Sequence, residues 1–171
     1  MTLPLQVTSE YTKKNLLEMQ KVLHRKTARL CTILSLSGFG LALVGAVVIS
    51  GIMIYMGILW GLLFWGMRNH PARKSAKKTV QSNRKNYGSN VITTLKFYQT
   101  MLIAQNETTG TTLREDYGQV RELLRTGPLV IVLLEDRVAL MADCSGMEQE
   151  DAEALWNLLR ENCRSAEVFE R

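Results

Sequence analysis

Histidine, cysteine and proline are scarce in this chain of 171 residues, which holds 2, 3 and 3 of them. The cysteines Cys31, Cys144 and Cys163 are odd in number and have no paired spacing, which argues against a disulfide scaffold or a zinc site. Glycine-rich phosphate loops and paired metal-ligand motifs are also missing from the sequence. We therefore expect no cofactor and no metal site.

Catalytic groups are also hard to find. Asp143, Cys144 and Ser145 place a carboxylate, a thiol and a hydroxyl side by side, but no histidine lies near them in the sequence. A strand-to-helix turn in which Ser145 caps the helix, with Glu148 three positions later, accounts for the same residues more simply. We expect no catalytic residues and no enzyme.

The most informative absence is that of charge from Leu30 to Met67, a run of 38 residues without Asp, Glu, Lys, Arg or His. As a helix it would be about 57 Å long, roughly twice what a bilayer core requires. One span would leave much of the run outside the membrane, whereas two short spans fit. The sequence predicts a transmembrane helical hairpin with spans at 30–49 and 52–67 and a turn at Ser50-Gly51.

Both flanks of this run are basic, and a cytoplasmic excess of Lys and Arg fixes membrane orientation. We expect basic helices in segments 1–29 and 68–90, and a multi-pass protein of the inner (plasma) membrane with both termini in the cytoplasm. The cations near the spans could contact anionic lipid headgroups, at about 1 kcal/mol each, or the two helices could simply pack together. These cations are Lys21, Arg25, Lys26, Arg29, Arg68, Arg73, Lys74, Lys77 and Lys78.

Small residues recur inside the run, where 7 of the 12 glycines lie. Ala42 and Ala46, and likewise Gly57 and Gly61, stand four positions apart, a spacing that lets helices approach closely. The sequence predicts packing within the hairpin through these four residues, with a homodimer through the Gly57 and Gly61 face as an alternative. Since no charge lies in the spans, a transporter or channel working alone is disfavoured.

The net charge of +5 hides a division between the two halves of the chain. Residues 1–90 hold 13 basic and 2 acidic residues, whereas residues 91–171 hold 8 basic and 14 acidic residues. Because the positive charge brackets the apolar run, its closest partner is the lipid bilayer, and we expect no nucleic-acid partner.

The segment 91–171 predicts a small soluble domain. About six short runs rich in branched and aromatic residues are separated by tight turns, which is typical of an antiparallel sheet. An apolar face over residues 148–163 predicts a closing C-terminal helix. Before the first basic helix, Leu3–Val7 could add an edge strand, because Pro4 requires a position that needs no donor. The fold class is therefore an α+β membrane protein.

This order of parts resembles the YcxB-like family of small bacterial membrane proteins. The residues that carry the resemblance are 95–98, 117–120, 129–134 and 143–147, followed by the helix 148–162. Relatives often have Lys and Phe where this chain has Cys144 and Met147, which weakens any ligand-gripping role for a cation there. The resemblance implies a pleckstrin-homology-like (PH-like) β-barrel or roll capped by the C-terminal helix, and it brings no established activity.

Three functions follow from these predictions. The leading one is a membrane-anchored domain that binds another protein or a peptide at the cytoplasmic face, because the acidic domain favours protein over lipid. The second is a sensor that reads anionic lipid through the basic juxtamembrane helices. The third is an accessory subunit of a transporter, with the hairpin as its docking surface.

Overall fold

The computed structural model describes residues 4–48, 50–136 and 138–170, so Leu3 and Ile49, which the sequence places at the ends of a strand and a span, lie outside the described residues. The chain divides into two compact units, which we describe separately. One is the hairpin unit, residues 20–78. The other is the sheet unit, whose described residues fall in 4–19 and 79–170.

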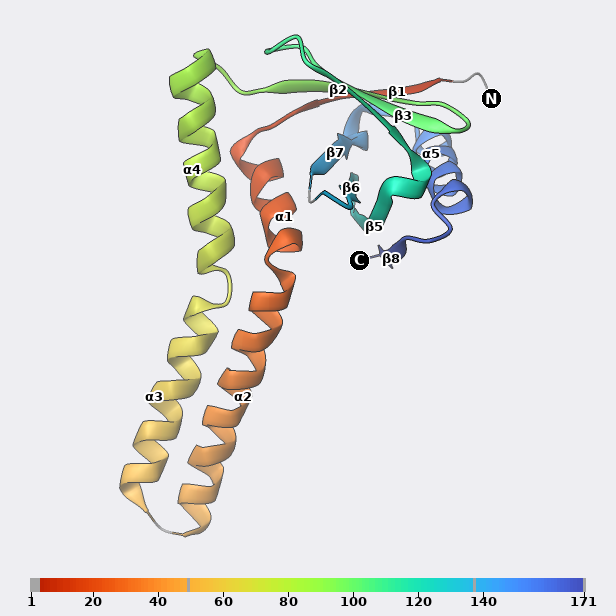
Figure 1. The fold of residues 1–171 in the computed structure, drawn as a ribbon. Coiled ribbons are helices and arrows are strands. Elements are labelled where there is room, and N and C mark those ends of the chain that lie inside the picture. Colours follow the sequence, from red (N-terminus) through yellow and green to blue (C-terminus); the bar gives the residue numbers. More distant parts are fainter. Residues whose placement is uncertain (1–3, 49, 137, 171) are drawn as a thin grey trace. The chain divides into compact units, whose positions relative to one another are not determined.

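The hairpin unit is built from α2 (Arg25–Val47) and α3 (Gly51–Met67), two helices that run side by side (Figure 1). Ser50 precedes α3 in an extended conformation, as a turn between helices requires. A two-residue break at Arg68 and Asn69 separates α3 from α4 (His70–Tyr87). α1 (Lys13–Leu23) precedes α2, and only His24 interrupts the two helices, whose hydrogen bonds continue on both sides of it.

Both α2 and the stretch from Gly51 to Tyr87 are long and apolar enough to span a membrane, judged by length and composition. Their large apolar side chains are mostly exposed: Leu43 is 71%, Ile52 79% and Val47 83% accessible. A water-soluble protein rarely leaves so much contiguous apolar surface uncovered. The structure therefore carries two candidate membrane-spanning helices.

The sheet unit contains two four-stranded sheets. The first has the order β1-β2-β3-β4 and is antiparallel throughout, and the second has the order β7-β6-β5-β8. The first sheet consists of β1 (Leu5–Glu10), β2 (Ile92–Phe97), β3 (Met101–Asn106) and β4 (Thr112–Asp116). The second consists of β5 (Val120–Thr126), β6 (Leu129–Leu134), β7 (Ala139–Asp143) and β8 (Glu167–Glu170).

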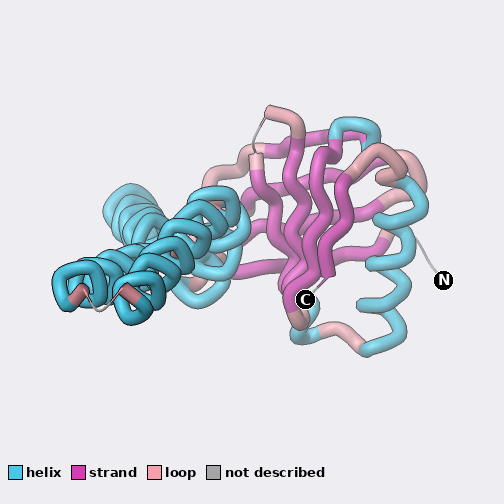
Figure 2. Tube along the Cα trace, turned by 90° about the horizontal axis from the view of Figure 1, so that it is seen from below, coloured by secondary structure: helices cyan, strands magenta, loops and turns pink. Residues whose placement is uncertain are grey.

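One core joins the two sheets and α5 (Gln149–Asn162), which lies beside the strands (Figure 2). Phe97 of β2, Val132 of β6 and Trp156 of α5 are all buried in it. Tyr117, in the short 3-10 helix η1 (Tyr117–Gln119) between β4 and β5, belongs to the same core, and its hydroxyl donates to Tyr98 O at 2.7 Å. Burial of these large side chains supplies the main driving force for folding.

Of the expected barrel or roll, a closed barrel is not formed, because the described strands form two separate sheets. β1 and β7 come together at one corner, but there the Asp143 amide donates to the Ser9 hydroxyl at 2.8 Å, so that a side chain takes the place of a backbone ladder. The prediction of a fully antiparallel arrangement is also wrong, because β8 pairs with β5 in parallel. β8 is only four residues long and half acidic, and it gave no strand signal in the sequence.

The expected cap on the C-terminal helix is also wrong. Ser145 lies in the short 3-10 helix η2 (Cys144–Gly146), where its amide donates to the Asp143 carboxylate at 3.1 Å. The residue that precedes α5 is Glu148, and its side chain makes no capping hydrogen bond. Asp143 thus caps the short helix η2, and Ser145 does not cap α5.

Candidate functional site

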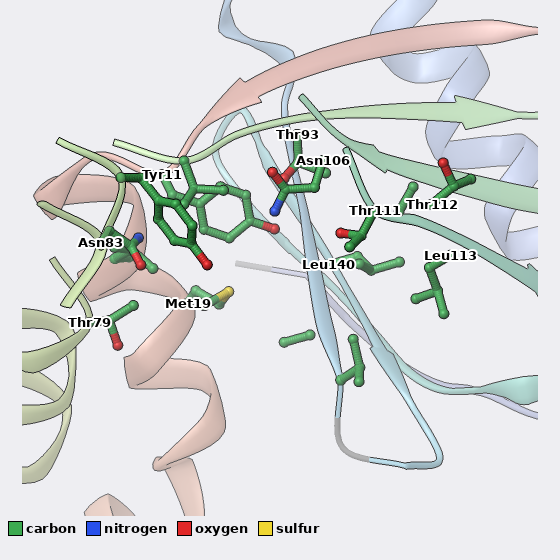
Figure 3. A pocket seen from close by; sticks show the side chains of 16 residues that line it. Tyr11, Met19, Thr79, Asn83, Thr93, Asn106, Thr111, Thr112, Leu113 and Leu140 are labelled. Atoms are coloured by element: carbon green, nitrogen blue, oxygen red, sulfur yellow. The ribbon is translucent and has the colours of Figure 1, made fainter. Parts of the chain in front are cut away.

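A cavity of about 550 Å³ lies within the sheet unit (Figure 3). Small-molecule sites commonly enclose about 300–1,000 Å³. The residues that line it come from α1, the second half of α4, and strands β2, β3, β4 and β7 with their adjoining loops: Tyr11, Leu16, Met19, Thr79, Asn83, Tyr87, Val91, Thr93, Ala104, Asn106, Thr111, Thr112, Leu113, Val138, Ala139 and Leu140.

Helical spacing presents the lining side chains of α1 and α4 to the cavity. Thr79, Asn83 and Tyr87 are four positions apart, so they share one face of α4. Leu16 and Met19 likewise share a face of α1 and are buried. α1 begins at this place because the Thr12 hydroxyl accepts the Asn15 amide at 3.2 Å, as an N-cap does.

The turn between β3 and β4 forms another part of the cavity wall and is internally braced. The Asn106 side-chain oxygen accepts the amides of Thr108 and Thr109, each at 3.0 Å. Gly110 has a φ of 73°, a left-handed conformation that glycine adopts without strain. Asn106 and the two threonines that follow this glycine, Thr111 and Thr112, are thereby held at the cavity mouth.

Buried and exposed lining residues are arranged in two zones. The floor is apolar and buried: Leu16 is 0%, Ala104 5% and Leu140 6% accessible. The mouth carries hydroxyl and amide groups, and Thr111 and Thr112 there are exposed. Figure 3 shows Tyr11, Asn83 and Met19 on one side of the cavity, with Leu113 and Leu140 toward the other.

Tyr11 is the lining residue with a perturbed titration. Burial raises the pKa of its phenol, while hydrogen bonds with the Met141 backbone and the Thr93 side chain partly oppose the rise. Tyr11 is therefore neutral at physiological pH. No Asp, Glu, Lys, Arg or His is among the described residues that line the cavity.

Next to the cavity, Asp143 anchors a polar network that ties β7 to β1 and α1. Its carboxylate accepts the Asn15 amide at 2.8 Å, and the same Asn15 nitrogen donates to Glu10 O at 3.2 Å. Burial tends to raise the pKa of Asp143, but hydrogen bonds from Ser145 and Asn15 and the nearby Lys14 charge outweigh it and lower the pKa. Asp143 is therefore an ionised structural anchor.

The neighbouring thiol is poorly suited to nucleophilic chemistry. Cys144 is buried, and burial with the adjacent Asp143 charge raises its pKa to about 11. Burial likewise raises the pKa of Cys163 to about 12. Since the thiolate is the reactive form, both thiols are almost fully protonated at neutral pH. Within the described chain, no cluster of three or more His, Cys, Asp or Glu could hold a metal ion.

In the hairpin unit, glycines bring α2 and α3 into backbone contact. A Cβ added at Gly57 would lie 2.5 Å from Ala42 N, and one added at Gly61 would lie 2.8 Å from the Phe39 ring. Ser35 also donates to Gly61 O at 2.8 Å. Gly57, Gly61 and Ala42 thus lie at the contact between the two helices.

Ala46 lies elsewhere, because its side chain is exposed. The close contacts of α2 are made instead by Gly38 and Gly45, where an added Cβ would come within 2.6 Å of Gly61 N and 2.7 Å of the Met53 Cβ. The register of the helix crossing selects these glycines. The four-residue spacing of Ala42 and Ala46, on which the prediction for α2 was based, does not include Gly38 or Gly45.

The cations expected at lipid headgroups all belong to the hairpin unit. Lys26, Arg29, Arg68, Arg73, Lys74, Lys77 and Lys78 are exposed, whereas Lys21 and Arg25 are partly buried and engaged in contacts of their own. Arg68 lies over the ring of Trp65, with 5.8 Å from its guanidinium carbon to the ring centroid. The structure thus leaves seven of the nine cations on the surface.

Sequence reasoning missed the cavity, because its polar groups are threonines and asparagines that no motif marks. They come from six elements that lie far apart in the chain. The comparisons with known proteins add no assignment: no family model matches the chain, and no curated protein matches its sequence.

Proposed function

We propose that this chain is an integral protein of the bacterial inner membrane that anchors a PH-like protein-interaction domain at the cytoplasmic face, and that it is a relative of the YcxB-like proteins. In this proposal α2 and α3 cross the bilayer as a hairpin. The sheet unit is the interaction domain.

The observation that carries the proposal is that the hairpin lies, in the sequence, between two strands that pair with each other. β1 precedes the hairpin and β2 follows it, yet the two strands pair in register from Leu5–Phe97 to Glu10–Ile92 (Figure 1). Paired strands lie on the same side of a membrane, so both ends of the hairpin must return to that side. Two spans satisfy this condition, and one span does not.

The charge of the flanks supports the cytoplasmic side. Cations near the ends of spans are retained in the cytoplasm, and seven exposed cations flank this hairpin. The acidic excess in residues 91–171 disfavours a direct contact of the sheet unit with anionic lipid. A protein or peptide therefore suits the sheet unit better than a membrane surface does.

Topology reporters test the anchor. A reporter inserted at Ser50 should lie outside the cytoplasm and one fused at Arg171 inside it. The proposal fails if both reporters lie inside or if their locations are reversed. A crosslinked pull-down of the full chain from native membranes then tests partner binding, and recovery of lipid alone would contradict it.

A second candidate, anionic-lipid sensing, is favoured by the four cations of α4, Arg73, Lys74, Lys77 and Lys78, which are all exposed. Replacing these four by Gln in the full chain distinguishes the two functions. If the crosslinked protein partners are retained, the interaction-domain proposal stands. If the protein partners are lost while the domain stays folded, lipid sensing through α4 is the better account. Replacement of the exposed Gln81, Ser82 and Asn86 by Ala is the matched control on the same helix.

A further inference from the structure

The described lining of the cavity in the sheet unit disfavours charged ligands. Among the described residues that line it none carries a formal charge, in a chain whose charged residues make up 22% of the sequence. A phosphate or carboxylate would need Lys, Arg or several converging amides, and an ammonium would need a carboxylate or an aromatic cage. A charged ligand would therefore lose its hydration without compensation.

The polar groups at the mouth are available for a neutral ligand. In the described chain, the Asn83 amide and the Thr112 hydroxyl take part in no hydrogen bond, and Asn106 uses its oxygen in the turn but has its side-chain nitrogen free. Together they offer donors and acceptors suited to hydroxyl, ester or amide groups. Asn106 and Thr112, at the adjoining ends of the paired strands β3 and β4, set the polar end of the site.

The floor sets the other end. Leu16, Met19, Val91, Ala104 and Leu140 present buried apolar surface, each at most 9% accessible. An apolar chain placed there would gain roughly 25 cal/mol for each Å² removed from water. A purely polar solute of the same volume would gain nothing from this surface.

We propose that the cavity is a binding site for an uncharged amphiphile, a molecule with one apolar chain and a neutral head that carries hydroxyl, ester or amide groups. The chain occupies the floor between α1 and the sheets, and the head meets Asn106 and Thr112. This inference concerns the sheet unit alone and does not depend on the proposed topology or on a protein partner.

The site also touches the chain at both roots of the hairpin. Met19 and Thr79, which line the cavity, are the residues of the sheet unit that directly precede and follow the hairpin unit in the sequence. An occupant would therefore contact α1, α4 and the strands within the sheet unit. Neutral amphiphiles can reach such a site from a bilayer or from water, and the test separates the two sources.

The test uses the full chain in phosphatidylcholine nanodiscs with a photoactivatable monopalmitoylglycerol as the probe. After illumination, labelled peptides are identified by mass spectrometry, with labelling of α2 and α3 as the internal reference. We expect labelling of the cavity peptides that excess monopalmitoylglycerol removes and that palmitate, with its negative charge, leaves in place. Competition by water-soluble monobutyrin instead would assign the ligand to the aqueous phase.

Two variants make the result specific. Asn83→Trp fills the cavity from α4 and should reduce cavity labelling at least about ten-fold, which corresponds to about 1.4 kcal/mol. Gln81→Trp, on an exposed position of the same helix, should leave it unchanged. Thr112→Lys places a cation at the exposed mouth and should allow palmitate to compete.

The proposal is overturned if the cavity peptides are unlabelled, if Asn83→Trp labels as well as the native chain, or if palmitate competes equally before and after the Thr112→Lys change. Should Asn83→Trp fail to fold, the Thr112→Lys arm decides alone, because Thr112 is exposed and its replacement disturbs no buried contact.

Discussion

The hairpin and the sheet unit bury opposite kinds of residue. In the hairpin, Gly57 and Gly61 are buried while Leu43 and Ile52 are more than two-thirds exposed. In the sheet unit, Trp156 is 2% accessible and the largest side chains form the core. Both parts are rich in apolar residues, but the large apolar side chains are exposed in the hairpin and buried in the sheet unit.

This difference agrees with the proposed bilayer environment of the hairpin and an aqueous environment of the sheet unit. Leucine gains little by leaving lipid, so helix association in a bilayer depends on close backbone packing, which glycine permits. In water, large apolar side chains gain most from burial. The proposed membrane position of the hairpin thus has a counterpart in its packing, beyond its hydropathy.

The largest effect that would sharpen the comparison comes from tryptophan. Trp156→Ala removes a buried ring from the core and should destabilise the sheet unit by about 3–5 kcal/mol. Trp65→Ala removes a ring that is 57% exposed and should cost less than about 1 kcal/mol. Urea unfolding followed by circular dichroism in detergent measures both. Equal costs would mean that the two parts bury side chains by the same rule.

The next effect comes from replacing a small residue of the hairpin by a larger one. Gly57→Val drives a side chain into the backbone of α2 and should destabilise the helix pair by about 3 kcal/mol, because Ala42 N and Gly38 O cannot yield. Gly66→Val, in the same helix with no atom within 4 Å of an added Cβ, is the control. Thermal melting in detergent reports the change. An unaffected Gly57→Val protein would refute the glycine contact.

Much of this contrast could be predicted from the sequence. The uncharged run, its midpoint at Ser50-Gly51 and the Gly57 and Gly61 spacing are local signals, and they led to the helical hairpin and two of its contacts. The strand runs after Asn90 were also local. Periodicity along the chain suffices wherever an element is decided by its own residues.

The rest depends on contacts between distant segments. The pairing of β1 with β2 spans the whole hairpin, and the closure of β1 against β7 through Ser9 and Asp143 joins residues 134 positions apart. β8 forms only because β5 offers it an edge. The cavity arises where these elements meet, so no stretch of sequence announces it.

A smaller effect tests the polar network that holds the start of α1 to β7 within the sheet unit. Asn15→Ala removes the amide that donates to the Asp143 carboxylate and should destabilise the sheet unit by about 1.5–3 kcal/mol, because that bond involves a charged acceptor. Lys13→Ala, on an exposed position of the same helical turn, should be nearly neutral. Urea midpoints measure both. A neutral Asn15→Ala change would show that Ser9 alone closes this corner.

The smallest effect concerns Glu153 of α5, whose carboxylate forms a two-point ion pair with Arg125 of β5. Arg125 also reaches Glu170 of β8, at 3.6 Å, so the pair sits where α5 and β8 meet β5. The hydrogen bonds from Arg125 lower the pKa of Glu153 below 4.5. A carboxyl whose pKa is lowered in the folded state adds stability above its unfolded pKa and loses it as the pH falls through the folded pKa.

The sheet unit should therefore lose stability on acidification below pH about 4.5, and Glu153→Gln should reduce this loss while leaving part of it, because the pKa of Asp143 is lowered as well. Glu150→Gln, an exposed change on the same helix, should leave the pH dependence as it is. Urea midpoints at neutral and acid pH measure the three proteins. The hairpin should keep its helical signal across the same range, because its sequence from Leu30 to Met67 holds no ionisable acid or base apart from Cys31 and Tyr55. A parallel loss in both parts would end the distinction between them.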